Sequence, residues 1–220
     1  MVAVSINREL KKTVPDLALG CVSAAVEVEQ HSQALWREIE LHLMQVATSF
    51  NSDAIGSIPQ IAAMRSAYRS LGKDPSRYRG SAEALLRRIL SGKGLYQVNN
   101  VVDINNLISL ESLLPAGSYD LFNVSTPMEL RVGRSGETYK GIGKEQINIE
   151  NLPVFADEHG PFGSPTSDSE RAMIRLETRN ILLVIFSFAG FGELDKWMDR
   201  AAVLLRSYAA GQSIECNKIA

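Results

Sequence analysis

The sequence has few of the residues that build disulfide frameworks or metal sites. Its two cysteines, Cys21 and Cys216, lie far apart in the 220-residue chain, so neither a disulfide framework nor a zinc site is predicted. We expect both to be buried or idle thiols in a reducing cytosol. The three histidines, His31, His42 and His159, have no metal-ligand spacing, which leaves the sequence without a predicted metal.

Long apolar runs are also missing. The longest covers residues 181–188 and is too short to cross a bilayer. Residues 1–13 contain no apolar stretch of signal-peptide length. With 45% hydrophobic and 22% charged residues, the composition is ordinary for a globular protein. We therefore expect a soluble, cytoplasmic protein with no membrane partner.

Motifs for enzymatic chemistry are equally scarce. No G-x-S-x-G nucleophile elbow occurs. The run Gly141-Ile142-Gly143-Lys144 lacks the full phosphate-loop pattern and lies among predicted strands, so we interpret it as a turn. The sequence predicts no metal, nucleotide or flavin cofactor, and we assign no catalytic residue.

What the sequence does have is a basic segment, residues 65–93, called here the basic island. It carries eight cations and two anions, a net charge of 8 − 2 = +6, whereas the whole chain has 23 − 25 = −2. Such a local cationic field indicates a polyanionic partner, most simply nucleic acid. The candidate RNA-binding residues are Arg65, Arg69, Lys73, Arg77, Tyr78 and Arg79. The alternative is an ordinary solvated helix face.

Hydrophobic periodicity and turn residues predict the elements. Helices are expected at residues 32–50, 59–71, 81–90, 98–114 and 193–208. Strands are expected at 17–28, 121–122, 129–132, 138–139, 146–149, 153–156, 173–176 and 181–188, the last of them a fully buried central strand. The tail after Gly211 is expected to fray. This order indicates an α+β fold: a single domain over residues 1–220 with a layered antiparallel sheet or sandwich core and helices packed on it.

Two polar groups stand out beyond the basic island. On a helix, Asn99, Asp103 and Asn106 share one face, either as hydrogen-bond ties to the backbone or as a pocket wall. Further along, Asp120 could orient Arg131 or cap a turn.

These groups also carry a family resemblance. The ordered runs 65–90, 101–106, 114–120, 130–137, 155–157 and 178–183 resemble the tRNA-editing domain of the phenylalanyl-tRNA synthetase β chain, most of all its short free-standing relatives. The resemblance covers roughly residues 60 to 190 and implies a layered α+β domain that hydrolyses mischarged aminoacyl-tRNA without a covalent nucleophile. It also implies tRNA or aminoacyl-tRNA as the partner, with a small amino-acid-like ligand in a pocket.

The chain departs from that family at two pocket positions. Gly117 stands where the family has a histidine, and Val184 stands where it has a glutamate. The tyrosine-specific editing site therefore cannot be carried over. The pocket candidates implied are Asp103, Asn106, Gly117, Ser118, Asp120, Arg131 and Val184. Whether Asp168 faces this pocket is open.

Three functions remain open at this point. The first is an RNA-binding module that hydrolyses a mischarged aminoacyl-tRNA in trans. The second is a non-catalytic module that binds tRNA or an amino acid. The third is a protein-interaction domain whose basic face docks an acidic partner. Aminoacylation itself is not expected.

Overall fold

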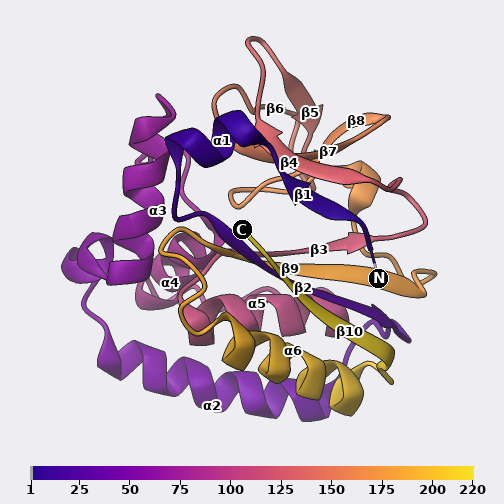
Figure 1. Ribbon diagram of the computed structural model, residues 1–220. Helices are drawn as coiled ribbons and strands as arrows, with labels where there is room; N and C mark the ends of the chain where they lie inside the picture. The colour runs from indigo at the N-terminus through magenta and orange to yellow at the C-terminus, as the bar shows by residue number, and fades with distance from the viewer. Residues whose placement is uncertain (1) are drawn as a thin grey trace.

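The layers of the fold are a sheet, a second sheet and a set of helices, stacked in that order (Figure 1). The computed structural model describes residues 2–220. Both core layers use the same central strand, so the helices and the two sheets form one α+β domain, which confirms the predicted fold class.

The first sheet has the strand order β1-β4-β7-β8. Its strands are β1 (Val4–Ile6), β4 (Met128–Val132), β7 (Pro153–Asp157) and β8 (Gly160–Gly163). Strand β1 runs parallel to β4, whereas the other pairs are antiparallel. The hairpin of β5 (Thr138–Lys140) and β6 (Gln146–Asn148) projects beside this sheet (Figure 1).

The second sheet is antiparallel, with the order β10-β2-β9-β3. Its strands are β2 (Ala18–Ala25), β3 (Ala116–Asp120), β9 (Asn180–Ser187) and β10 (Gln212–Ile219). One face of this sheet meets the first sheet. Helices α5 (Asn100–Ser112) and α6 (Leu194–Tyr208) cover the other face, and α2 (Gln33–Ser49) packs on the outer side of these two helices (Figure 1).

Helices α3 (Pro59–Ser70) and α4 (Ser81–Leu90) lie at one end of the stack (Figure 1). Pro59 suits the first turn of α3, because its missing N–H would have no helical partner there. Asn99 caps α5 by accepting a hydrogen bond from the Val102 N–H. The remaining elements are α1 (Arg8–Thr13) and the 3-10 turns η1 (Ser52–Ser57) and η2 (Glu170–Ala172).

The apolar sequence of β9 is continuous because its side chains face a hydrophobic core on both sides of the sheet. Leu182 and Val184 point toward the first sheet, while Leu183 and Ile185 point toward the helices. All four side chains are at most 1% exposed. The predicted fully buried central strand is confirmed.

Three expectations about strands were wrong. Residues 121–122 form a turn, and the strand there is β3, which ends at Asp120. Residues 173–175 are irregular, and residue 176 begins a turn. The C-terminal tail does not fray, because β10 pairs along β2 from Gln212 to Ile219. None of the helices in the described range 2–220 is both long and apolar enough to span a bilayer.

Candidate nucleic-acid interface and pocket

The basic island folds into α3, α4 and the loop between them. Within it, Glu83 in the first turn of α4 is buried, with 1% of its side chain exposed. A carboxylate in the first turn is favoured by the helix dipole. Three arginines converge on its Oε1 atom: Arg65 Nη1 at 2.8 Å, Arg87 Nε at 2.9 Å and Arg79 Nε at 3.9 Å. We call these residues the arginine triad.

The triad leaves cationic donors at the surface. The exposed fractions of the side chains are 17% for Arg65, 47% for Arg79 and 36% for Arg87. Arg65 also donates from Nη2 to Ser76 Oγ. Across residues 2–220, the terminal nitrogens of Arg79 and Arg87 have no hydrogen-bond acceptor. These guanidinium groups are thus free to bind an anion from solution.

Two other island residues are engaged inside the fold. Lys73 is 7% exposed and its Nζ donates to the backbone carbonyls of Glu150 and Asn148. The same ammonium lies 3.8 Å from the centre of the Tyr78 ring. Burial lowers the pKa of Lys73 from its ordinary value. Lys73 is therefore turned inward, and its ammonium covers one face of the part-buried Tyr78 ring.

Arg69 on α3 and Arg77 in the loop between α3 and α4 are both exposed. Within the described chain, neither guanidinium has a hydrogen-bond or ion-pair partner. The structure thus divides the predicted cations into free ones, triad members and one that is turned inward.

The two positions where this chain departs from the resembled family are adjacent in space. Gly117 on β3 and Val184 on β9 are register partners in the second sheet. Val184 is fully buried and packs in the core between the sheets. Tyr119 takes the space at Gly117: a β-carbon placed there would be 2.5 Å from the Tyr119 hydroxyl oxygen. Gly163 on β8 leaves room for the same ring.

The Tyr119 hydroxyl donates to Asp168 Oδ1 over 3.1 Å. The same oxygen accepts the Ser164 N–H at 3.2 Å. Burial raises the pKa of Asp168 to about 7, although both hydrogen bonds act in the opposite direction. Asp168 thus belongs to the polar cluster that surrounds Tyr119, next to Gly117.

The remaining pocket candidates are dispersed. Asp103 accepts from Trp36 Nε1 at 2.6 Å and from the Val98 N–H at 3.1 Å, which ties α5 to α2 and to the preceding loop. Arg131 forms a bidentate pair with Glu137. Asn106 is half-buried on α5, and Ser118 is buried in β3 opposite Leu183. The structure does not bring these four candidates together in one cavity.

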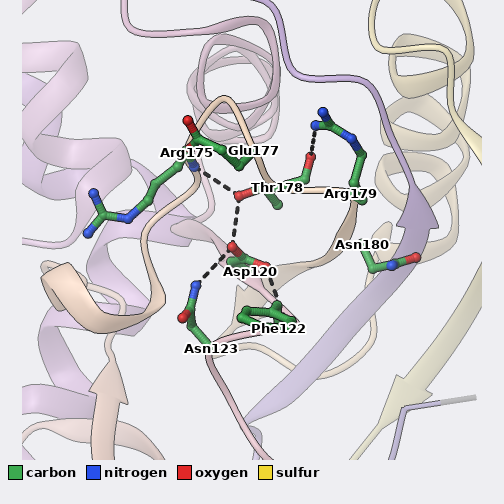
Figure 2. Close-up of a pocket in the computed structure, with 8 residues that line it drawn as sticks. All are labelled: Asp120, Phe122, Asn123, Arg175, Glu177, Thr178, Arg179 and Asn180. Atoms are coloured by element: carbon green, nitrogen blue, oxygen red, sulfur yellow. Dashed lines mark hydrogen bonds between the residues drawn. The ribbon is translucent and has the colours of Figure 1, made fainter.

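Asp120 does line a cavity. It is a cleft of about 390 Å³ that lies where β3 ends and β9 begins (Figure 2). Its carboxylate accepts hydrogen bonds from the Phe122 N–H, Asn123 Nδ2 and Thr178 Oγ1. The other lining residues are Arg175, Glu177, Arg179 and Asn180. Asp120 therefore caps the turn after β3, one of the two roles predicted for it, and does not contact Arg131.

Sequence reasoning missed the role of Glu83 and left the role of Asp168 open. Glu83 was counted only as an anion that lowers the island's charge. The role of Asp168 depends on Tyr119, which lies 49 residues away in the chain. The available signal was the alternation on β3, which places Tyr119 on the same face as Gly117.

Comparisons with known proteins agree with this architecture. The family model of the B3/4 domain matches residues 63–192, more than half of the chain. The chain therefore belongs to the B3/4 domain family.

Its curated relatives are longer proteins. The phenylalanine–tRNA ligase β subunit of Pasteurella multocida is 28% identical over 98 residues, which are 44% of this chain and 12% of that protein. The corresponding subunit of Paramagnetospirillum magneticum is 30% identical over 83 residues, or 37% of this chain and 10% of that one. The matches thus span about a tenth of each relative.

A solved structure shares the fold over the whole chain. It is an N-terminal fragment of the phenylalanyl-tRNA synthetase β subunit from Pyrococcus horikoshii, with a TM-score of 0.52 and 13% identity. The superposition covers 100% of this chain and 52% of the fragment.

Proposed function

We propose that this B3/4 domain protein binds RNA, with tRNA as the target, through the surface of α3, α4 and their connecting loop, and that it does so without hydrolysing an aminoacyl ester on that tRNA. The observation that carries the proposal is the arginine triad, which leaves guanidinium donors free in the segment that also contains the exposed Arg69 and Arg77. Arginine suits phosphate groups because its planar fork donates two parallel hydrogen bonds. The relatives' names, which are those of tRNA ligase subunits, support tRNA as the RNA.

The packing at Gly117 supports the non-catalytic part of the proposal. A hydrolytic pocket needs space for an aminoacyl group and a water molecule. At the corresponding positions of this chain, the buried ring of Tyr119 takes the space at Gly117, and Val184 is fully buried in the core.

RNA binding is tested by fluorescence anisotropy with labelled tRNA over a range of salt concentrations. Arg69→Ala and Arg77→Ala should each weaken binding and make the plot of log affinity against log salt shallower by about one unit, because each removes one phosphate contact. Lys196→Ala on α6, which also removes one exposed cation, is the matched control. Equal affinities for all four proteins would refute this binding surface.

Hydrolysis in trans is the second candidate, and Asp168 favours it. A carboxyl whose pKa is about 7 can accept a proton from water near neutral pH. Purified protein should be incubated with a panel of mischarged tRNAs. Our proposal expects deacylation at the spontaneous rate, whereas acceleration that Asp168→Asn abolishes would establish the second candidate.

A further inference from the structure

The arginine triad has an unusual arrangement for a surface that binds anions, because its centre is an anion. Glu83 is almost fully buried, and only one of its two oxygens is used by the triad. The other, Oε2, is buried and has no hydrogen-bond partner in the described part of the chain. Burying a carboxylate with an unsatisfied oxygen costs free energy, so the ion pairs must offset that cost.

The shared oxygen fixes the arginines relative to one another. Arg65 comes from α3, Arg79 from the loop, and Arg87 from the second turn of α4, one helical turn beyond Glu83. Arg65 is fixed further by Ser76. A long guanidinium side chain that is held in place loses less conformational entropy when it binds a ligand.

The two more exposed members of the triad keep both of their terminal nitrogens free of acceptors among residues 2–220. Arg87 uses only Nε to contact Glu83, and Arg79 approaches it with Nε. Their terminal nitrogens are therefore the groups presented to solvent. A tetrahedral anion with several oxygens can accept hydrogen bonds from two such forks at once.

From this geometry we infer that Glu83 is a positioning residue that holds Arg79 and Arg87 as a binding site for one phosphodiester group of the RNA backbone. The inference rests on the proposed RNA binding and adds a specific subsite to it. The three arginines and Glu83 have a net charge of +2, which suits a singly charged phosphodiester.

Electrostatics and positioning predict opposite effects for the same substitution. Glu83→Gln removes one negative charge from the binding face. If only net charge matters, the variant binds RNA more tightly than the wild type. If Glu83 positions the arginines, the variant binds RNA about tenfold more weakly, the size of one lost charge-assisted hydrogen bond.

Asp74→Asn is the matched control. Asp74 is an exposed acid of the same island, and its Oδ1 accepts the Ser76 N–H, which an asparagine oxygen can also do. This variant makes the same change in charge without touching the triad. It should bind RNA as tightly as the wild type or slightly more tightly.

A second pair of variants covers the possibility that Glu83→Gln does not fold. Arg79→Lys and Arg87→Lys keep the charge but lose the planar fork, and both side chains are well exposed. Each should weaken tRNA binding about tenfold, measured by anisotropy, with circular dichroism to confirm folding.

The outcomes separate this inference from the proposed function. If the wild type binds tRNA and Arg69→Ala weakens it, while Glu83→Gln binds as tightly as Asp74→Asn, the phosphate subsite is refuted and RNA binding stands. Full affinity in both lysine variants would likewise refute the subsite. If the wild type does not bind tRNA at all, both proposals fail.

Discussion

The hydroxyl of Tyr119 lies where the side chain of any larger residue at position 117 would begin. A β-carbon at Gly117 would be 2.5 Å from that oxygen, 3.0 Å from Cζ of the same ring and 3.2 Å from Asp168 Oδ2. Real β-carbons essentially never approach a neighbour as closely as the first of these distances. A glycine at 117 and a tyrosine at 119 thus form a matched pair.

The first prediction tests this pairing. Gly117→Ala should lower the free energy of unfolding by about 1–3 kcal/mol, the usual cost of overpacking a core. Tyr119→Phe should cost about 1 kcal/mol through the lost hydrogen bond to Asp168. In the double variant the phenylalanine lacks the clashing oxygen, so the combined cost should be smaller than the sum.

Urea unfolding of the single and double variants measures this coupling. Gly56→Ala is a suitable control, since a β-carbon there would meet only Arg65 Nε, at 4.0 Å. Strict additivity of the two substitutions would contradict the shared space.

The second prediction concerns pH. The folded state raises the pKa of Asp168 to about 7, so between the ordinary pKa near 4 and pH 7 the folded protein holds a proton that the unfolded chain releases. This group therefore stabilises the fold less and less as the pH rises through that window, by up to ~1.4 kcal/mol per pH unit. The Asp168→Asn variant has no carboxyl at this position, so its free energy of unfolding should not fall in this way as the pH rises.

The measurement is the unfolding free energy of wild type and Asp168→Asn at several pH values from 4 to 8. The wild type should lose stability relative to the variant as the pH rises, and the trend should level off above pH 7. A difference that stays constant across this range would show that the carboxyl is not shifted.

The third prediction concerns the C-terminal strand. Deleting residues 212–220 removes β10 and leaves the backbone of β2 as an exposed sheet edge. We expect a melting temperature several degrees lower and a tendency to self-associate, seen by thermal unfolding and light scattering. Deleting Ala220 alone should change neither. An unchanged melting temperature in the longer deletion would mean that β10 contributes no stability.

The fourth prediction concerns the ion pairs that join the helix layer. Arg200 on α6 donates to both carboxylate oxygens of Glu111 on α5, at 2.9 and 2.8 Å, and also to Glu38 on α2. Because one half-buried guanidinium connects three helices, Arg200→Ala should cost about 1–3 kcal/mol of unfolding free energy.

Lys196→Ala provides the comparison on the same helix. Its exposed pair with Glu193 should contribute less than about 0.5 kcal/mol. Equal effects of the two substitutions in chemical denaturation would contradict a structural role for the Arg200 network.

Elements with local signals could be predicted from the sequence. Pro59 marks the start of α3, and the continuous apolar run of residues 181–188 marks β9. Both signals lie within the element itself, so they can be read without knowledge of tertiary contacts. The β3 strand was not predicted because Ala116, Gly117 and Ser118 have little preference for strands. These residues are extended because they pair with β9 and are buried against α5. The β10 strand was not predicted because it is an exposed edge strand, and its mostly polar residues show no clear alternation of apolar and polar side chains.

The sequence located the segment that carries the candidate interface, but it did not predict how the side chains of that segment are arranged. Charge counting located the basic island, since net charge is a property of composition. It could not show that Lys73 points inward or that Glu83 collects three arginines, because both depend on tertiary contacts. The pocket candidates came from polar clusters in the sequence and from a resemblance, and neither shows the tertiary contacts that place Asp103 beside Trp36 and Arg131 beside Glu137.

The opposite orientation of neighbouring residues on β9 has a practical consequence for spectroscopy. Leu182 and Leu183 are consecutive, yet one packs between the sheets and the other against the helices. In a sample with isotope-labelled leucine methyl groups, these two residues would report separately on the two halves of the molecule. A ligand's effect could thus be assigned to one half from resonances of adjacent positions.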